Sequence, residues 1–518
     1  VPMSKELTST KVQGLVHVKT PKFEGKDGAV TPSSEKLMVL VDPKTGKALG
    51  ASALAMKDGK EVGTYTVDEA TGKVTFTPGK DFTGTADPIV VQVIEKATGK
   101  AIAGLKYTPT VTPVTPTGED ATSTGKQGKV QMGTPKFTEG DAEVPLKVDT
   151  DQPAKFVVNG TAVEETTIDA TKEGAKVGTY TIDPLTGEVT FTPNKDFVGT
   201  PDAVTVQVKD ENGTATTAKY TPTVTAVTPT GEDVTTTGKQ GKVQTGTPKF
   251  TEEDAEVPLK VDADQPAKFV VNGTAVDDTM IDAMKDGAKV GTYTINPLTG
   301  EVTFTPNKDF VATPDAATVQ VKDENGISAT AKYIPTVTSV TPTGEDAAST
   351  GKQGKVQIGT PKFTEGDVEV PLKVDADQPA KFVVNGTAVE KTTIDATKDG
   401  AKVGTYAINP LTGEVTFTPN KDFSGTLDAV TVQVRDENGT VATATYTPTV
   451  TAVTPTGEDV TSTDVQGKAQ TAKPTFTEGD AEVPLDDSVP VTFEDGTTEK
   501  VIAGVGTFTV AADGTITF

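Results

Sequence analysis

The chain repeats itself at the length of a whole domain. The sequence Thr-Pro-Thr-Gly-Glu-Asp occurs four times, with its glutamates at Glu119, Glu232, Glu345 and Glu458, so that each interval is 113 residues. Repeats of solenoid proteins are about 20–50 residues long, whereas independent domains usually have about 100–150 residues. The sequence therefore predicts a row of similar domains, and it directs attention to the array rather than to a single site.

Other landmarks recur with the repeat and divide the chain into modules. Gly-Thr-Tyr, for example, recurs at Tyr65, Tyr180, Tyr293 and Tyr406. The first module is divergent, and the fifth is both divergent and shorter. Because the chain ends inside an expected strand, we expect that it is a fragment of a longer protein. The predicted modules 1 to 5 are residues 1–113, 114–226, 227–339, 340–452 and 453–518.

Within a module, polar and apolar residues alternate in short runs that are separated by turn sequences. The three valines of residues 204–208 fall on one face of an extended chain, as expected for a half-buried strand. Asn159-Gly160 and residues 210–213 have the composition of hairpin loops. Seven or eight short strands with regular turns indicate a β-sandwich. We therefore predict an all-β chain of tandem Ig-like β-sandwich modules in an elongated array, with a short helical turn at residues 168–177.

The expected core of each module is small, and it is built from the apolar residues of the alternating runs. For module 2 the predicted core is Phe137, Val144, Phe156, Val158, Tyr180, Ile182, Val189, Phe191, Phe197, Val206 and Tyr220. One position predicts local strain. Ala312 stands where other modules have Gly84, Gly199 and Gly425, so that a positive φ at this place would disfavour the alanine.

The connectors between modules are rich in proline, threonine and valine. In residues 220–231, Pro222 and Pro229 exclude a helix, and the β-branched residues favour an extended backbone. Such a segment is stiffer than a glycine- and serine-rich linker. We expect the last strand of each module to run nearly straight into the connector, which is the geometry of a spacer.

Composition excludes several classes of function. The net charge is −25 and the isoelectric point is about 4.5, so that the surface repels nucleic-acid phosphates. The chain has no cysteine, which excludes disulfides, thiol catalysis and cysteine-bound metals. No apolar run reaches the roughly 20 residues of a membrane-spanning helix. We expect a monomeric fragment that neither binds nucleic acid nor inserts into a membrane.

The sequence offers no set of catalytic residues. Its single histidine, His17, aligns with Gln131, Gln244 and Gln357 of later modules, so that no serine–histidine or cysteine–histidine pair is available in the repeat. We therefore predict that the protein is not an enzyme, and we predict no catalytic, cofactor-binding or metal-binding residues.

Calcium is the alternative that the acidic turns leave open, because carboxylate and carbonyl oxygens are its preferred ligands. The competing interpretation is that these residues serve the backbone of turns. An internal Lys–Asn isopeptide bond is a second alternative, which an intact-mass measurement would detect. The calcium candidates are Asp149 and Asp151, Asp262 and Asp264, Asp375 and Asp377, residues 210–212 with Asp323 and Asp436, and Glu119 with Asp120.

Two stretches resemble a known family. Residues 178–208 read Gly-Thr-Tyr-Thr-Ile-Asp-Pro-Leu-Thr-Gly-Glu-Val-Thr-Phe-Thr-Pro-Asn-Lys-Asp-Phe-Val-Gly-Thr-Pro-Asp-Ala-Val-Thr-Val-Gln-Val, and a Thr-Pro-Thr-Val-Thr connector at residues 221–225 precedes a Thr-Pro-Thr-Gly-Glu-Asp. The module resembles the CshA-type fibril repeat of streptococcal and related Gram-positive surface proteins. This resemblance implies a secreted protein, anchored to the cell wall, whose tandem repeats form fibrils that carry an adhesive head outward.

Two functions follow as hypotheses from the array and the resemblance. In the first, the modules are the structural stalk of a cell-wall-anchored adhesin, and a head outside this sequence contacts host extracellular matrix or other bacterial cells. In the second, the repeats themselves are weak adhesive modules, and repetition multiplies their affinity by about 10²–10⁴. Extension of the chain in solution and binding by the modules distinguish the two hypotheses.

Overall fold

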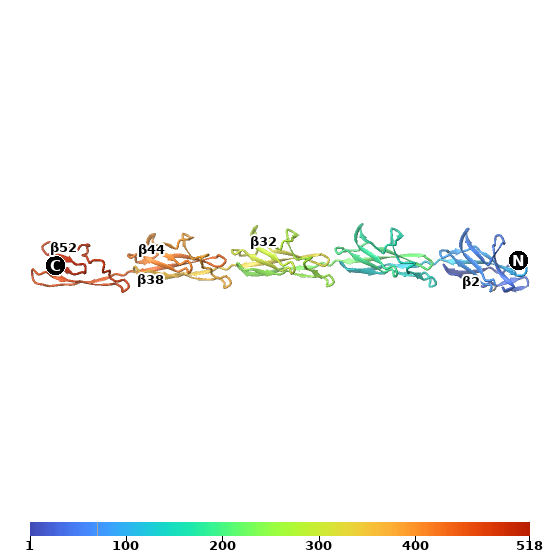
Figure 1. The fold of residues 1–518 in the computed structure, drawn as a ribbon, viewed down its shortest axis with the longest axis horizontal. Helices are drawn as coiled ribbons and strands as arrows, with labels where there is room; N and C mark the ends of the chain where they lie inside the picture. Colours follow the sequence, from blue (N-terminus) through green and yellow to red (C-terminus); the bar gives the residue numbers. More distant parts are fainter. Residues whose placement is uncertain (70) are drawn as a thin grey trace. The chain divides into compact units, whose positions relative to one another are not determined.

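The computed structural model describes residues 1–69 and 71–518, and within those residues the chain forms strands and turns without any helix (Figure 1). A helix long and apolar enough for a membrane span is accordingly not found in this described part. By its internal contacts the chain divides into two compact units. The first comprises Val1–Thr230, Phe250–Val261 and Val321–Ala329, and the second comprises Gly231–Lys249, Asp262–Gln320 and Thr330–Phe518.

Module 2 is a sandwich of two principal sheets. One sheet has the order β14-β24-β23-β18-β19, with β17 beside β23, and the other has the order β15-β22-β21-β20. A separate pair joins β13 to β16. The strands of module 2 are β13 (Thr117–Glu119), β14 (Ala121–Lys126), β15 (Gln131–Gly133), β16 (Lys136–Thr138), β17 (Leu146–Lys147), β18 (Lys155–Val158), β19 (Thr161–Ala162), β20 (Thr167–Lys172), β21 (Ala175–Ile182), β22 (Val189–Pro193), β23 (Val204–Asp210) and β24 (Ala215–Thr225).

The first long strand of the module runs parallel to its last. β14 pairs with β24 in a register that extends from Ala121 opposite Tyr220 to Lys126 opposite Thr225. The end of β14 therefore lies beside the point where the chain leaves the module. This pairing also confirms that the last strand runs into the connector of residues 220–231, because β24 continues to Thr225.

The core lies between the two sheets and is centred on three aromatic rings. The ring of Tyr180 lies 5.3 Å from that of Phe191 and 6.3 Å from that of Tyr220, measured between centroids. The Tyr180 hydroxyl donates a hydrogen bond to the carbonyl of Asp202, so that burial leaves it paired. The fully buried core residues of module 2 include Val144, Phe156, Tyr180, Ile182, Val189, Phe191, Val206 and Tyr220, as predicted.

Three residues of the predicted core are less buried than expected. Phe137 and Phe197 are only partly buried against the cluster, and Val158 is 37% exposed. Val158 shares the strand face of the buried Phe156, but it is the last residue before the Asn159-Gly160 turn. The alternation rule predicts which face a residue occupies, and it does not predict where the core ends along a strand.

The prediction of a helical turn at residues 168–177 is wrong. This segment lies in a hairpin of β20 and β21, whose loop is Glu173-Gly174 with φ of 52° and 82°. Two successive left-handed residues form the tight hairpin loop that matches the twist of the flanking strands. A register shift between Ala170 and Thr171 adds a bulge.

Modules 3 and 4 repeat this strand order. In module 4, for example, the sheets are β38-β48-β47-β41-β42, with β46 beside β48, and β39-β45-β44-β43. The strands of module 3 are β25 (Thr230–Glu232), β26 (Val234–Lys239), β27 (Gln244–Gly246), β28 (Lys249–Thr251), β29 (Leu259–Lys260), β30 (Lys268–Val271), β31 (Thr274–Ala275), β32 (Met280–Lys285), β33 (Ala288–Ile295), β34 (Val302–Pro306), β35 (Ala317–Asp323) and β36 (Ser328–Thr338). Those of module 4 are β37 (Thr343–Glu345), β38 (Ala347–Lys352), β39 (Gln357–Gly359), β40 (Lys362–Thr364), β41 (Lys381–Val384), β42 (Thr387–Val389), β43 (Thr393–Lys398), β44 (Ala401–Ile408), β45 (Val415–Pro419), β46 (Gly425–Thr426), β47 (Val430–Arg435) and β48 (Val441–Thr451).

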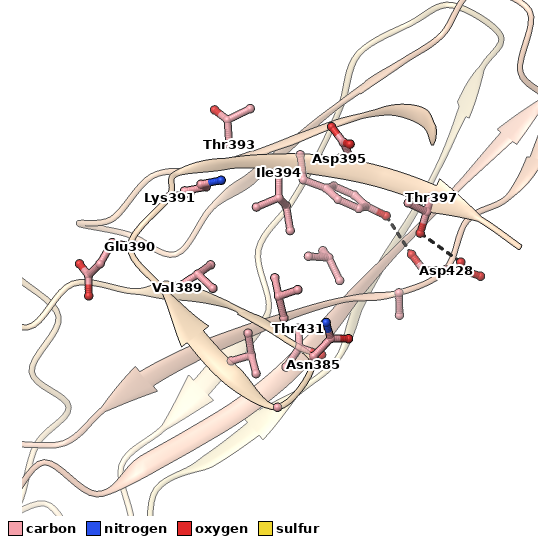
Figure 2. A pocket seen from close by; sticks show the side chains of 16 residues that line it. Asn385, Val389, Glu390, Lys391, Thr393, Ile394, Asp395, Thr397, Asp428 and Thr431 are labelled. Carbon is pink, nitrogen blue, oxygen red and sulfur yellow. Dashed lines mark hydrogen bonds between the residues drawn. The ribbon is translucent and has the colours of Figure 1, made fainter. Parts of the chain in front are cut away.

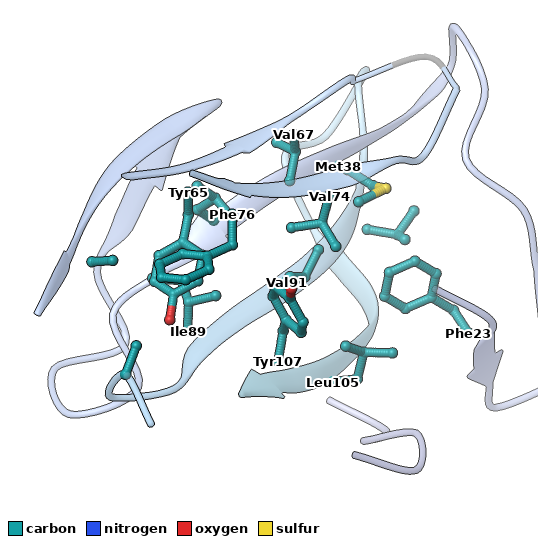
Figure 3. Packing of buried hydrophobic residues seen from close by; sticks show 14 of the residues in the cluster. Phe23, Met38, Tyr65, Val67, Val74, Phe76, Ile89, Val91, Leu105 and Tyr107 are labelled. Carbon is teal, nitrogen blue, oxygen red and sulfur yellow. The ribbon is translucent and has the colours of Figure 1, made fainter. Parts of the chain in front are cut away.

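Module 1 has the same two-sheet plan, and its core contains Tyr65, Phe76 and Tyr107 (Figure 3). Its strands are β1 (Leu7–Val12), β2 (His17–Lys19), β3 (Phe23–Gly25), β4 (Gly28–Val30), β5 (Lys36–Val41), β6 (Ala48–Gly50), β7 (Ser52–Lys57), β8 (Lys60–Val67), β9 (Val74–Pro78), β10 (Gly84–Thr85), β11 (Ile89–Glu95) and β12 (Ala101–Thr112). Module 5 has β49 (Thr456–Glu458), β50 (Thr471–Ala472), β51 (Thr475–Thr477), β52 (Glu499–Ile502), β53 (Gly506–Val510) and β54 (Ile516–Thr517). The prediction of an all-β chain of tandem β-sandwiches is confirmed.

The strained position predicted in module 3 is present. Ala312 has a φ of 133°, and the equivalent Gly84, Gly199 and Gly425 have φ of 117°, 126° and 133°. A positive φ of this kind disfavours any residue with a Cβ, at a cost of about 1–3 kcal/mol. Ala312 and Val337 nevertheless exchange two backbone hydrogen bonds, which hold the alanine in this conformation.

Candidate functional site: the contacts between successive modules

A buried glutamine fixes the chain where it leaves each module. Gln127 follows β14 and is 3% exposed. Its side-chain amide donates to the carbonyl of Lys195 at 3.0 Å, and its side-chain oxygen accepts from the backbone N–H of Val227 at 3.1 Å. Val227 lies in the connector that leads to module 3. The first residues of the connector are therefore hydrogen-bonded to the module that they leave, which restricts their direction.

The same glutamine contacts the next module through its backbone. Asn325 of module 3 donates its side-chain N–H to the carbonyl oxygen of Gln127 at 2.8 Å, and this asparagine is 9% exposed. The neighbouring Gly128 has a φ of 79°, and a Cβ on it would lie 1.9 Å from the side-chain oxygen of Asn325. Glycine is required here both for the turn and for the close approach of the asparagine.

This contact recurs at two further joints with the same geometry. We call it the asparagine latch, defined as the hydrogen bond from an asparagine side chain of one module to the glutamine carbonyl of the module before it. Asn212 reaches Gln13 at 2.9 Å, and Asn438 reaches Gln240 at 2.8 Å. The glutamine side chains also repeat, because Gln13, Gln240 and Gln353 accept from the N–H groups of Val114, Val340 and Val453.

Two lysines add ion pairs to the joint between modules 2 and 3. Lys129 lies 2.8 Å from Glu324, beside the latch. Lys126, at the end of β14, lies 2.6 Å from Asp254 and 3.8 Å from Glu256. The hydrogen bond from Lys126 lowers the pKa of the Asp254 carboxyl below its usual value and raises the pKa of the lysine. All of these groups are partly exposed, so that solvent screens each pair and its contribution is small.

Later joints carry the same pairs. Lys242 lies 2.9 Å from Glu437, and Lys239 lies 2.9 Å from Asp367, at the joint between modules 3 and 4. At the joint between modules 4 and 5, Lys352 lies 2.7 Å from Asp480.

The joint between modules 1 and 2 differs. Val12 and Leu15 stand where module 2 has Lys126 and Lys129, so that neither ion pair can form. At this joint Lys80 donates a hydrogen bond of 3.3 Å to the backbone carbonyl of Glu211. The latch of Asn212 is therefore accompanied by less electrostatic attraction than the latches at later joints.

The calcium candidates are engaged in turns. One side-chain oxygen of Asp149 accepts from the N–H groups of Asp151 and Gln152, and one of Asp210 accepts from those of Asn212 and Thr214. The same pattern recurs at Asp262, Asp375 and Asp436. These bonds support the interpretation as turn residues.

The remaining calcium candidates lie at the start of module 2. Asp120 accepts from the N–H of Lys219 in its own module, and Glu119 belongs to the short strand β13. In the described part of the chain, no three acidic or histidine side chains converge on one point where a metal ion would sit. Calcium binding remains an untested alternative.

A hollow in module 4 opens between the edges of its two sheets. It measures about 1090 Å³ and is lined by residues of β42 and β43, among them Val389, Ile394 and Thr397 (Figure 2). The charged groups at its rim are mostly compensated, because Glu390 pairs with Lys381 and Asp395 with Lys402. The rim therefore lacks the cluster of unpaired titratable groups that would indicate a catalytic site.

Sequence reasoning singled out the segment that contains the asparagine of the latch, without its role and without the glutamine. Residues 210–213 were predicted as a hairpin turn and as a calcium candidate, and their asparagine in fact lies at a joint. A signal was present in the sequence. Lys-Gln-Gly-Lys recurs at residues 126–129, 239–242 and 352–355, and Asp-Glu-Asn-Gly recurs at residues 210–213, 323–326 and 436–439. Two turn motifs that share the period of the module are candidates for contact between modules.

Comparison with protein families gives a match along almost the whole chain. The model described as the surface adhesin CshA repetitive domain matches residues 1–111, 113–224, 226–337, 339–450 and 452–518. The comparison with curated proteins gives no match.

The solved structures that match the chain have low sequence identity and low TM-scores. One is a tetra-tandem repeat in the extending region of a large adhesion protein, with 13% identity, 82% of this chain and 94% of that chain covered, and a TM-score of 0.22. Mouse cadherin-23 EC22–24 has 12% identity, 65% and 96% coverage, and a TM-score of 0.23. The eight N-terminal Ig domains of Down Syndrome Cell Adhesion Molecule have 11% identity and a TM-score of 0.18, and the match covers 99% of this chain but 63% of that one, which is less than two thirds of its length.

Proposed function

The chain belongs to the surface adhesin CshA repetitive-domain family, and we propose that its modules form a stalk that projects an adhesive head from the bacterial cell wall. Membership of this family makes the chain a repeat region of an extracellular surface adhesin. The stalk, the anchoring to the cell wall and the separate head are the proposal. According to this proposal, the head binds host extracellular matrix or other bacterial cells, and the modules serve as the spacer.

The observation that carries the proposal is the recurrence of the asparagine latch. In a stalk, each module must keep a defined orientation relative to the next. A connector without hydrogen bonds to either module would allow that orientation to vary. Here the connector is hydrogen-bonded to the module before it through Gln127 or Gln240, and the following module reaches back through Asn325 or Asn438. Contacts of this kind at successive joints support a mechanical role better than a role in recognition.

Small-angle X-ray scattering of the whole chain tests the proposal. We expect the scattering profile of a rod whose cross-section is that of one module. The matched variant carries Gly128→Ala and Gly241→Ala, which place a Cβ against Asn325 and Asn438. It should keep the cross-section and lose apparent length, because the joints bend. A compact particle in the unaltered chain would overturn the stalk.

The second candidate is that the repeats themselves bind weakly and repeatedly. It is favoured by the near-identity of modules 2 to 4, which presents any surface of one module several times. Avidity would then raise the apparent affinity by about 10²–10⁴ over that of one module. Binding of this chain to fibronectin, collagen or partner bacteria would support this candidate, and its absence in the five-module chain would remove it.

A further inference from the structure

The single histidine of the chain is buried in a hydrogen-bonded network of module 1. His17 lies at the start of β2 and is 0% exposed. Its Nδ1 lies 2.6 Å from the hydroxyl of Ser9 on β1, and that hydroxyl lies 2.6 Å from the hydroxyl of Tyr107 on β12. The ring of Phe76 on β9 meets the imidazole edge-on, with 5.3 Å between centroids. The imidazole therefore sits where both principal sheets of the module meet.

Other modules have a glutamine at this position, and its side chain makes more hydrogen bonds than the histidine does. In module 2 the hydroxyl of Ser123 donates to Gln131 at 2.6 Å and lies 2.5 Å from the hydroxyl of Tyr220, as in module 1. Gln131 also donates its amide to the carbonyl of Thr223 at 3.0 Å. The Nε2 of His17 has no hydrogen-bond partner among the described residues. The histidine thus keeps the hydrogen bond to the serine hydroxyl, and it lacks the second hydrogen bond that the glutamine donates to a backbone carbonyl.

Protonation of this imidazole is unfavourable in the folded module. An imidazolium has two N–H donors, and the one on Nε2 would be buried without an acceptor. The charged groups that act on His17 are Lys11 on β1 and Lys19 on β2, and both are cationic. The Tyr107 hydroxyl of the network is neutral in acid, as an ordinary tyrosine is, and burial raises its pKa further. Burial, followed by Lys11 and Lys19, lowers the pKa of His17 to about 4.

We propose that module 1 is an acid-sensitive module, in which protonation of His17 opens the packing of β1 and β2 while the glutamine-bearing modules stay folded. The device is local because the same network in modules 2, 3 and 4 contains Gln131, Gln244 and Gln357, which do not titrate. Acid would therefore open module 1, including the segment between β1 and β2 that carries Gln13, and leave the joints between modules 2, 3 and 4 intact.

The direction of the effect follows from proton linkage. The histidine of the unfolded module has a pKa near 6.5, and that of the folded module is about 4. Between these values the unfolded module binds more protons, so that the stability of module 1 is complete above pH 6.5 and falls as the pH decreases toward 4. A difference of about 2.5 pKa units corresponds to a change of roughly 300-fold in the ratio of folded to unfolded module.

Hydrogen exchange of the intact chain, followed by mass spectrometry of peptides from modules 1 and 2, measures this effect. Protection of module 1 should fall by roughly 100-fold more than that of module 2 between pH 7 and pH 4, after correction for the intrinsic exchange rate. His17→Gln should abolish the difference and raise protection of module 1 at pH 7. Gln131→His is the converse variant and should transfer the acid sensitivity to module 2.

Nuclear magnetic resonance gives a second readout that does not depend on unfolding, because the chain has one histidine to observe. The imidazole resonance should titrate well below pH 6.5. A titration near 6.5, a His17→Gln variant that keeps the acid sensitivity, or equal loss of protection in modules 1 and 2 would each overturn the proposal.

Discussion

The joint between modules 1 and 2 and the joint between modules 2 and 3 share one contact and differ in another. Both have the asparagine latch, formed by Asn212 at the first joint and by Asn325 at the second. The second joint adds ion pairs from Lys126 and Lys129, and the first has apolar residues at those positions. The difference separates two roles. Hydrogen bonds to the backbone define how the modules meet, and the ion pairs set how firmly they are held.

This comparison makes the first joint the softer of the two. A hydrogen bond of a buried amide contributes about 0.5–1.5 kcal/mol in net terms, and leaving its partner unsatisfied costs about 1–3 kcal/mol. An exposed ion pair contributes about 0.2–1 kcal/mol and weakens in salt. The second joint is therefore held by the latch, which does not depend on salt, and by ion pairs, which do. The first joint relies on the latch.

The largest expected effect comes from adding a Cβ at the latch. Gly128→Ala should cost about 1–2 kcal/mol from the left-handed backbone and about 1–3 kcal/mol from the displaced Asn325 hydrogen bond. The control is Gly354→Ala in module 4, because Gly354 has an almost identical φ of 78° and nothing within 4 Å of its Cβ position. Pulsed electron paramagnetic resonance between spin labels on modules 2 and 3 should show a broadened distance distribution for Gly128→Ala.

The cysteine-free chain allows such labels to be placed on introduced cysteines alone. Gly354→Ala should have the same free-energy cost from the left-handed backbone, but within module 4. It should leave the distribution of spin-label distances between modules 2 and 3 unchanged. If both variants gave the same distribution as the unaltered chain, the asparagine contact would not determine how these modules meet.

A smaller effect is expected from removing the asparagine side chain. Asn325→Ala and Asn212→Ala each remove a hydrogen bond to a glutamine carbonyl, at a cost of about 1–3 kcal/mol. The ion pairs of the second joint remain in Asn325→Ala, whereas Asn212→Ala leaves the first joint with little attraction. The distance distribution should therefore broaden more for Asn212→Ala. Equal broadening at the two joints would show that the ion pairs contribute nothing.

The smallest effect is electrostatic and acts on the second joint alone. Raising the salt concentration to about 1 M shortens the screening length to about 3 Å, so that the second joint should soften toward the first. Leu15→Lys places a lysine at the position equivalent to Lys129 and near Glu211, and it should stiffen the first joint by about 0.2–1 kcal/mol at low salt. A salt response at the unaltered first joint would contradict this assignment.

Sequence reasoning succeeded where the determinant was local. The alternation in residues 204–208 predicted β23, and the threonine-, valine- and proline-rich end of the module predicted a last strand that runs into the connector, where β24 in fact continues to Thr225. It failed at residues 168–177, because Glu173-Gly174 lacks the usual Asn or Asp at the first turn position. The equivalent loops Asp286-Gly287 and Asp399-Gly400 carry that signal and have the same left-handed backbone.

The joints could not be predicted in the same way. Asn325 and Gln127 are 198 residues apart, and their contact depends on how one folded module meets the next. The alternation and the turn residues of each segment are explained by the fold of its own module. They therefore contain no information on which residues of two modules come into contact. The burial of His17 was equally out of reach, because its partners Ser9 and Tyr107 come together only through the parallel pairing of β1 with β12.

The central claim is that successive modules are held by specific contacts rather than joined by a free connector. Pulsed electron paramagnetic resonance on the unaltered chain tests it most directly, with one label pair across the first joint and one across the second. We predict a narrow distance distribution across the second joint and a broader one across the first, at the same low salt concentration. Broad distributions of equal width at both joints would contradict the claim.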